Sequence, residues 1–376
     1  MSTAESETAD VAGPPLPSST PKLETGPSRP PRLLLQWHVT EQCNLRCGHC
    51  YQTADAGAPE LPYDGMLMIL EQFVRLLQEW GIPGHITFTG GEPFLKDWFI
   101  PLLEQTAKHR DRCSMAILTN GTLLDDGIGA RLNKLGTKFV QVSVDGMRET
   151  HDAMRGSGAF DRALRGLAIL RKHGIPSMVS FTAHAGNVKD FPALAQLCRR
   201  RKVGVVWSDR LLPLGRGDGM TGALMTPAEV EAFFECMYEA RMRIRKSWFN
   251  RTQVKMHRAL QFLTLRKHGE RDAAPYRCSA GRTLLAVMPS GAVYPCRRMP
   301  VEVGRLPQQN LGAIYEASPF LQALREPDRA PAGCEACEFK QSCNGGLRCL
   351  SYAYYGDPFK ADPQCFRLSA GLPGLP

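Results

Sequence analysis

Residues 37–51 have the sequence WHVTEQCNLRCGHCY and continue an apolar run that begins a few positions earlier. The stretch holds three cysteines at C-x3-C-x2-C spacing, in a loop after a predicted strand: Cys43, Cys47 and Cys50. Three thiols so close together indicate a metal or cluster site. Fe–S clusters are normally held by four Cys thiolates, so three leave one iron with a position that a small molecule can occupy. The alternative is a zinc knuckle, for which His38 and His49 are nearby ligands.

Short apolar runs alternate with amphipathic segments from residue 33 to residue 208. The sequence predicts strands at 33–39, 84–89, 114–119, 138–144, 177–182 and 203–208. It predicts helices between them at 64–80, 97–109, 125–135, 160–173 and 191–201. This alternation is typical of a parallel sheet with right-handed crossovers. Six such units are too few for a closed eight-fold barrel, so we expect an α/β fold with a partial (β/α)6 barrel.

Polar and glycine-rich segments come directly after several predicted strands. They are the cysteine loop, Gly90-Gly91-Glu92-Pro93, residues 119–121 and residues 143–146. In barrels of this kind the chemistry lies at the C-terminal ends of the strands. We therefore expect these segments to converge on one rim.

The rest of the chain divides into three segments. Residues 1–31 are rich in Pro, Ser, Thr, Gly and Glu, which predicts a disordered tail before the barrel of residues 32–209. Residues 210–269 form a connecting segment of mainly helical character. Residues 270–376 have little periodicity but contain seven of the 13 cysteines, which predicts a small, cysteine-rich α+β domain held together by metal.

The composition, with 43% hydrophobic and 22% charged residues, is ordinary for a soluble globular protein. No apolar run is long enough for a membrane span, and the N-terminus lacks the pattern of an export signal. Thirteen cysteines without such a signal predict a reducing, cytoplasmic location rather than a disulfide framework.

The formal net charge of +9 comes from scattered Lys and Arg, with short groups at 199–202 and 241–246. Such groups are typical of solvated helix faces; alternatively they attract an acidic partner such as an acidic peptide. No basic run is interleaved with aromatic residues, so we expect no nucleic-acid partner.

The cysteine loop resembles the signature of the radical S-adenosylmethionine (SAM) superfamily. Tyr51 after the third cysteine fits this resemblance, and so does Gly90-Gly91-Glu92-Pro93 at the end of the second strand. The C-terminal region resembles the SPASM domain, which holds auxiliary iron–sulfur clusters in peptide-modifying members. That likeness rests on Cys278 and Gly291-x4-Cys296, on C-x2-C-x5-C, and on two later cysteines. Residues 343–365 look closest to the enzyme of pyrroloquinoline quinone biosynthesis and its relatives.

By this resemblance, Cys43, Cys47 and Cys50 hold a [4Fe–4S] cluster that reductively cleaves SAM to a 5′-deoxyadenosyl radical. Residues 90–93 resemble the segment that binds the SAM amino group, with Glu92 as a partner for the ammonium. Ser143 and Asp145 resemble positions near the SAM ribose and carboxylate, and Asn120 and Arg155 are further candidates. No other catalytic residue is predicted.

The C-terminal cysteines would form two groups. We assign one auxiliary cluster to Cys278, Cys296 and Cys349, and the other to Cys334, Cys337, Cys343 and Cys365. The usual pattern has a cysteine where Leu347 stands here, and Cys349 comes two residues later. This departure leaves the number, type and ligands of the auxiliary clusters open. Structural zinc is the alternative, because thiolates accept either metal.

The resemblance implies hydrogen abstraction from a peptide, most simply a ribosomally made precursor. A small molecule or tetrapyrrole is the alternative substrate, and formylglycine formation in a sulfatase is another. A non-enzymatic iron–sulfur or zinc module would require the SAM motifs to be coincidental. The expected electron donor is a flavodoxin or ferredoxin. Because no leader-binding domain fits before residue 33, a peptide substrate would need a separate recognition protein or direct recognition.

Overall fold

The computed structural model describes residues 29–52, 59–246, 251–326 and 329–368, so the predicted tail lies almost wholly outside it. One ten-stranded sheet runs through these residues in the order β10-β9-β8-β1-β2-β3-β4-β5-β6-β7. The strands are β1 (Leu33–His38), β2 (Gly84–Thr89), β3 (Cys113–Thr119), β4 (Val140–Ser143), β5 (Ser177–Ala183), β6 (Val205–Arg210), β7 (Gln253–Lys255), β8 (Leu284–Val287), β9 (Ala292–Tyr294) and β10 (Gly304–Arg305).

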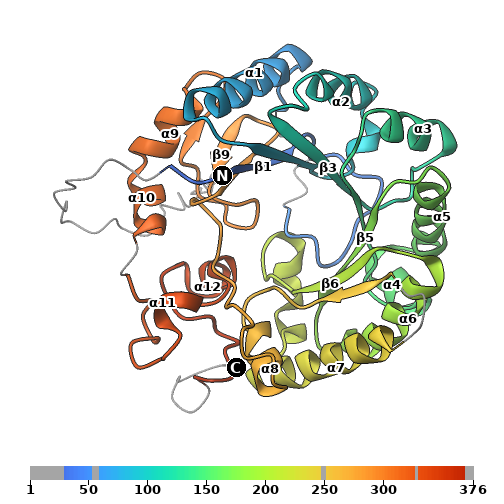
Figure 1. Cartoon of the computed structure of the whole chain (residues 1–376), viewed down its shortest axis with the longest axis vertical. Coiled ribbons are helices and arrows are strands. Elements are labelled where there is room, and N and C mark those ends of the chain that lie inside the picture. Colours follow the sequence, from blue (N-terminus) through green and yellow to red (C-terminus); the bar gives the residue numbers. More distant parts are fainter. Residues whose placement is uncertain (1–28, 53–58, 247–250, 327–328, 369–376) are drawn as a thin grey trace, which may run out of the picture.

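The predicted α/β partial barrel is confirmed. Strands β1 to β7 pair in parallel with their neighbours, and the sheet curves with helices along its outside (Figure 1). The helices of this part are α1 (Tyr63–Trp80), α2 (Phe99–Ala107), α3 (Asp126–Lys134), α4 (Arg148–Arg155), α5 (Ala159–Lys172), α6 (Phe191–Arg201), α7 (Pro227–Arg245) and α8 (Gln261–Lys267). Three short 3₁₀ segments accompany them: η1 (Pro93–Leu95), η2 (Val188–Asp190) and η3 (Gly215–Ala223).

The sheet extends beyond the six expected strands on both sides. On one side β7, within the segment expected to be helical, pairs in parallel with β6. On the other side β8 pairs in parallel with β1, so the cysteine-rich region continues the barrel sheet. Both strands are short, with three and four residues, and such short runs show no clear periodicity in sequence.

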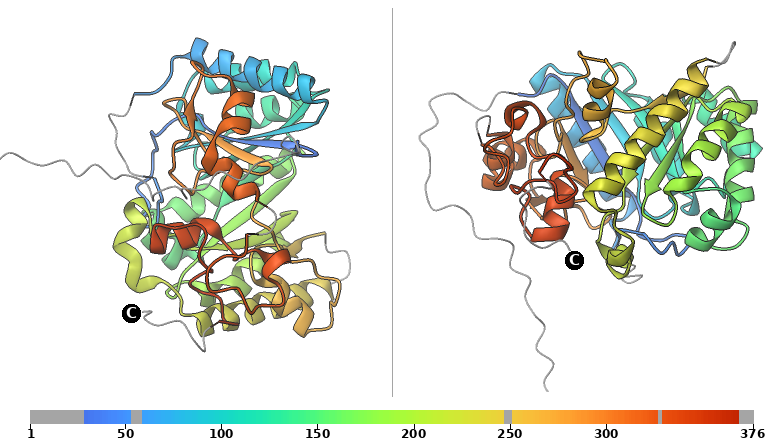
Figure 2. Two further views of the ribbon diagram at one scale, coloured as in Figure 1. Left: turned by 90° about the vertical axis from the view of Figure 1, so that its left-hand side faces the viewer. Right: turned by 90° about the horizontal axis from the view of Figure 1, so that it is seen from below.

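The C-terminal region packs against one flank of the barrel, as the two views of Figure 2 show. Its helices are α9 (Leu311–Ala317), α10 (Pro319–Arg325), α11 (Lys340–Cys343) and α12 (Arg348–Tyr355). A single large hydrophobic cluster spans the interface, from Trp37 and Phe88 in the barrel to Leu285 and Tyr315 beyond it. Among the described residues, no helix is long and apolar enough to cross a membrane.

Candidate functional site

The cysteine loop leaves the end of β1 and forms one wall of a cavity of about 540 Å³ at the C-terminal rim of the barrel. Cys43, Cys47 and Cys50 all line this cavity. The loop is held by backbone bonds to distant segments: Gly48 N–H donates to the Met154 carbonyl at 3.0 Å, and Gly217 N–H to the Cys50 carbonyl at 3.2 Å. The three thiols are therefore positioned by the surrounding barrel as well as by their own loop.

The glycine turn after β2 lies directly against the cysteine loop. Gly91 N–H donates to the Thr40 carbonyl at 2.7 Å, and Glu92 N–H donates to the Gln42 carbonyl at 2.8 Å. Gly90 has a φ of +136°, and a Cβ on Gly91 would clash with the Gln42 carbonyl oxygen. Only glycine permits this approach, and it leaves the backbone of both glycines open to the cavity.

Glu92 is fully buried and is not among the residues that line the cavity. Its carboxylate accepts the Thr119 hydroxyl at 2.8 Å, the Asn120 N–H at 2.8 Å and the Phe94 N–H at 3.3 Å. Burial raises the pKa of Glu92 to about 7 against these donors. The carboxylate thus fastens the end of β3 to the glycine turn. This differs from the expected contact with a SAM ammonium. Pro93, which begins η1, also lies outside the cavity lining.

Ser143 lines the cavity at the end of β4, whereas Asp145 lies behind the wall and is buried. Asp145 accepts from Arg155 Nε at 2.5 Å and from the Thr182 N–H at 2.8 Å. His49 Nε2 lies 3.1 Å from the same carboxylate. Burial opposes ionisation, yet Arg155 and His49 hold the pKa of Asp145 well below its usual range. Asp145 is therefore an anion that orients two cavity-lining side chains.

Arg155 has a more central position than a surface loop would give it. It ends α4, a helix that the sequence did not predict, and its side chain is only 10% exposed. Its Nη1 lies 3.7 Å from Cys47 Sγ, and Asn120 Nδ2 lies 3.8 Å from Cys43 Sγ. Two N–H donors thus point at two of the three sulfurs.

These residues fit the cluster that the family implies. Three thiols face one cavity, N–H donors approach two of them, and the turn beside them exposes its backbone. Hydrogen bonds of this kind to the ligand sulfurs are a common feature of iron–sulfur sites. Across the described ranges, no three His, Cys, Asp or Glu side chains are arranged to hold a single metal ion. Three thiols with N–H donors aimed at two of their sulfurs suit a cluster that leaves one iron without a protein ligand.

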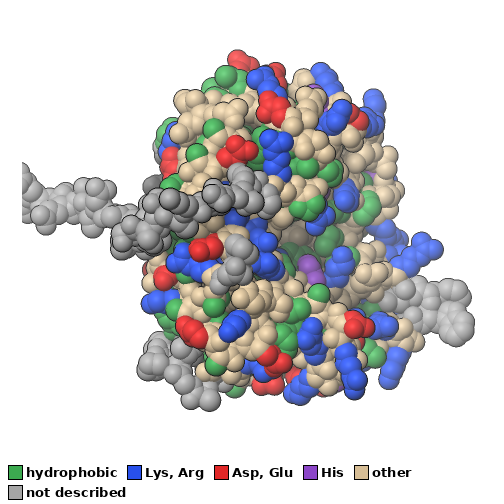
Figure 3. Space-filling view, turned by 60° about the vertical axis from the view of Figure 1, so that its left-hand side comes forward, with side chains coloured by type: hydrophobic (Ala, Val, Ile, Leu, Met, Phe, Trp, Pro, Cys, Tyr) green, Lys and Arg blue, Asp and Glu red, His purple; other side chains and the backbone are tan. Residues whose placement is uncertain are grey.

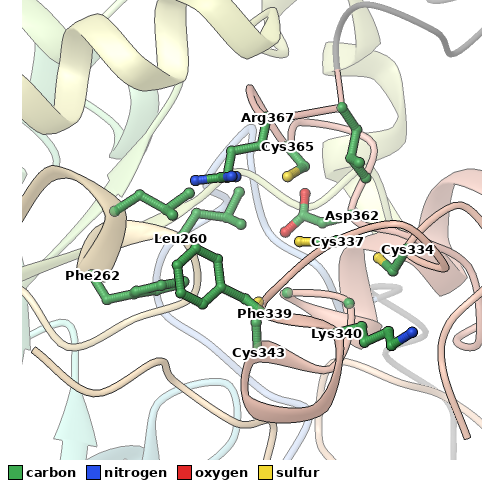
Figure 4. A pocket seen from close by; sticks show the side chains of 14 residues that line it. Leu260, Phe262, Cys334, Cys337, Phe339, Lys340, Cys343, Asp362, Cys365 and Arg367 are labelled. Carbon is green, nitrogen blue, oxygen red and sulfur yellow. The ribbon is translucent and has the colours of Figure 1, made fainter. Parts of the chain in front are cut away.

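Four C-terminal cysteines gather around a second, small cavity of about 20 Å³, seen from close by in Figure 4. They are Cys334, Cys337, Cys343 and Cys365, the set assigned above to one auxiliary cluster. Aromatic side chains of Phe262 and Phe339 close one side, and Asp362 lies among the sulfurs. Four thiols around one space suit either an iron–sulfur cluster or zinc.

The other three cysteines also lie near one another, behind the wall of the large cavity. Burial, with the nearby Cys296 and Cys278, raises the pKa of Cys349 to about 12. Cys296 Sγ also lies 3.9 Å from Gln36 Oε1 on β1, so this group borders the first strand of the barrel. The structure thus places near one another the members of each of the two cysteine groups that the resemblance assigned to the auxiliary clusters.

Sequence reasoning missed the ion pairs that join the barrel to the C-terminal region. Asp209 accepts from Arg298 of the C-terminal region and, within the barrel, from Arg258 at 2.6 Å. Arg210, at the end of β6, forms a two-pronged pair with Asp362 at 2.9 and 2.5 Å. Arg210 lines the large cavity and Asp362 the four-cysteine cavity, so this pair is part of a shared wall. Partners 152 residues apart give no local signal in the sequence.

Acid should destabilise the fold through buried histidines. Burial lowers the pKa of His38 to about 3 and that of His151 to about 4, and the pKa of the half-buried His85 is also lowered to about 4. Each is neutral when folded, while the unfolded chain binds a proton below about pH 6.5. The stability is therefore complete above that pH and declines toward pH 4, by up to ~1.4 kcal/mol per pH unit for each histidine.

The measurement is the thermal midpoint at pH 7, 6 and 5 for the wild type and for His85→Gln, which lies at the start of β2 and away from the cavity. The midpoint of the wild type should fall more steeply with acid than that of the variant. Parallel curves would contradict a neutral, half-buried His85.

Comparisons with known proteins agree with this geometry. The model of the radical SAM superfamily matches residues 37–198, and an iron–sulfur cluster-binding domain, SPASM, matches residues 278–338. An AdoMet-dependent heme synthase of Methanosarcina barkeri is 29% identical over 88% of this chain and 95% of its own. The mycofactocin maturase MftC of Mycobacterium ulcerans is 29% identical over 91% of this chain and 90% of its own.

A solved structure shares the fold. Streptococcus suis SuiB bound to its precursor peptide SuiA superposes with a TM-score of 0.68 at 17% identity, covering 89% of this chain and 75% of SuiB. The family implies a [4Fe–4S] cluster with SAM, and the SPASM domain implies auxiliary clusters. The cysteine loop, the partial barrel and both domain matches lead to one conclusion: the chain is an enzyme of the radical SAM superfamily with a C-terminal SPASM domain.

Proposed function

We propose that the chain is a radical SAM oxidoreductase that abstracts hydrogen from a peptide, in the maturation of a ribosomally made precursor. The observation that carries this proposal is a single cavity lined both by the barrel and by the SPASM region. The cysteine loop and glycine turn line one side, and Arg297 and Arg298 from the SPASM region line another. The maturase MftC, a relative along most of its length, and the peptide-bound SuiB support a peptide substrate.

Cys43, Cys47 and Cys50 would hold the [4Fe–4S] cluster, and the two C-terminal cysteine groups would hold the auxiliary clusters. When bound, the cluster and SAM supply a radical that removes a hydrogen atom from an unactivated carbon. The backbone of Gly90 and Gly91 and the hydroxyl of Ser143 would contact SAM. Asp145 holds Arg155 and His49 in place, and Phe181 and Trp207 would contribute apolar surface that limits water around the substrate.

The first test is anaerobic reconstitution with iron and sulfide, followed by reduction in the presence of SAM. We expect release of 5′-deoxyadenosine and about 12 iron atoms per chain for three [4Fe–4S] clusters. About ten would indicate that one cluster is [2Fe–2S], and about four would remove the auxiliary assignment. A flavodoxin or ferredoxin from a reducing cytoplasm is the proposed reductant. Absence of SAM cleavage by the reduced, iron-loaded protein would sink the proposal.

The peptide substrate is tested with small precursors encoded beside this gene, by mass spectrometry after turnover. A mass change that depends on SAM and reductant supports maturation. A peptide that emerges unchanged, alone and with any adjacent small recognition protein, argues against it.

A tetrapyrrole side chain is the second candidate substrate. Two observations favour it: the heme synthase relative, and the six arginines along the cavity, since tetrapyrrole intermediates carry several carboxylates. Turnover of coproporphyrin III or its iron complex, with loss of carboxylate groups as CO2, would select this candidate over the peptide.

A further inference from the structure

The large cavity has a strong excess of positive charge. Six arginines but only two carboxylates, Glu41 and Asp209, line it. The arginines are Arg46, Arg155, Arg210, Arg216, Arg297 and Arg298. The protein face drawn in Figure 3 is likewise hollowed and carries Lys and Arg side chains beside the hollow.

Half of these arginines are already paired. Arg155 pairs with Asp145, Arg210 with Asp362, and Arg298 with Asp209. Within the part of the chain that the structure describes, no carboxylate forms an ion pair with Arg46, Arg216 or Arg297. Arg46 is exposed, whereas the other two are half-buried.

Arg297 is fixed between the SPASM region and the cysteine loop. Its Nη1 donates to the Thr89 hydroxyl at 3.3 Å, and its guanidinium lies 5.6 Å from the centre of the Tyr51 ring. A guanidinium has five N–H donors in a planar fork, so most of them stay available to a ligand. The guanidinium of Arg297 is therefore held in position beside the cavity, and most of its N–H groups remain available to a ligand.

Arg216 approaches the same cavity from η3, which is tied to the cysteine loop by the Gly217 N–H. Its Nε is buried and has no hydrogen-bond partner among the described residues. A buried donor without a partner is destabilising, and an acceptor from a ligand would remove that cost.

The cluster and SAM together do not neutralise these two cations, because an oxidised [4Fe–4S] core with three thiolates carries one negative charge and SAM carries one net positive charge. We propose that Arg216 and Arg297 bind carboxylates of the substrate and so make the enzyme specific for a polycarboxylate. The inference rests on the proposed function and narrows its substrate class. The carboxylates can come from acidic residues of a peptide or from the propionates of a tetrapyrrole, and the same guanidinium forks suit both.

The test measures binding to the reconstituted enzyme with two probes and their neutral counterparts. One pair is coproporphyrin III and its tetramethyl ester; the other is a Glu-rich peptide and the same peptide with Gln. The wild type should bind at least one acid form and prefer it to its neutral counterpart. Arg216→Gln and Arg297→Gln should each weaken that binding about tenfold or more, since each removes a charge-assisted hydrogen bond. Arg297→Lys keeps the charge but loses the fork, so its loss should be intermediate.

Arg75→Gln is the matched control, because Arg75 lies on α1 beside a separate surface cavity and should leave probe binding unchanged. Iron content and the thermal midpoint show whether each variant is folded. Preference for coproporphyrin identifies a tetrapyrrole source, and preference for the Glu peptide identifies a peptide source.

Three outcomes overturn the inference: neither acid probe binds, the neutral forms bind equally, or both arginine variants lose SAM affinity as strongly as probe affinity. Failure of this inference is distinguishable from failure of the proposed function. SAM cleavage without carboxylate binding removes only the inference, whereas carboxylate binding without SAM cleavage removes only the function.

Discussion

Replacing Cys47 by alanine should abolish SAM cleavage and remove about four of about twelve iron atoms from the reconstituted enzyme. Cys47 is buried, and its sulfur lies 3.7 Å from Arg155 Nη1, so the surrounding fold fixes the position of this ligand. With two ligands left, a cluster would lack a third anchor. The measurements are 5′-deoxyadenosine release under reducing conditions and iron per chain.

The control is Cys198→Ala. Cys198 is a buried thiol on α6 and lines neither the large nor the four-cysteine cavity. That variant should keep its iron and its SAM cleavage and lose only a little stability, about 1 kcal/mol for a small buried group. A Cys47→Ala enzyme that retains full iron and cleaves SAM would refute the assignment of the loop.

The sequence predicted the barrel well because its signals are local. Each of the six central strands has its own apolar run, and glycines with positive φ follow the helices before β2 and β4: Gly81 after α1 and Gly136 after α3. The cysteine loop and Gly90-Gly91 were predicted at the rim, and both line the cavity. Parallel pairing then follows from the alternation alone.

What the sequence could not predict depends on contacts between distant segments. Glu92 was expected to face a ligand, and the structure gives its carboxylate three donors inside the wall, two from the end of β3 and one from Phe94 of η1. The sequence predicted no helix at Arg155, but α4 turns its side chain toward Asp145 and Cys47. β7 and β8 are too short to show a period and are strands because β6 and β1 present free edges to them.

The Arg210–Asp362 pair should be the most sensitive point for stability in the shared wall. Their side chains are 3% and 1% exposed, and the guanidinium also donates to Gln364 Oε1 at 3.0 Å. Arg210→Met leaves the Asp362 carboxylate buried without its cation, which should destabilise the fold by about 3–5 kcal/mol. The measurement is the urea midpoint of the reconstituted enzyme.

A double variant distinguishes two causes of instability: the loss of the ion pair itself, and the burial of an Asp362 carboxylate without its cation. Arg210→Met with Asp362→Asn removes both charges, and the amide oxygen can still accept one of the N–H groups of Leu347 and Gln364 that now bind Asp362. It should be more stable than Arg210→Met alone, because two well-packed neutral groups avoid an uncompensated buried charge. Arg243→Met, which breaks an exposed pair with Glu239, should cost at most about 0.5 kcal/mol.

The same variants show whether the two cavities are mechanically linked. Asp362 lies among the four sulfurs and accepts the Leu347 N–H just before α12, so its position shapes the four-cysteine cavity. Arg210→Met should therefore lower the iron content of that site as well as the stability, and the double variant should restore part of both. If Arg210→Met lost stability yet kept every iron atom, the pair would only stabilise the interface between the barrel and the SPASM domain and would not shape the four-cysteine site. If iron content and stability fall together in the single variant and recover together in the double variant, then residues in the wall of the large cavity also determine the geometry of the four-cysteine site.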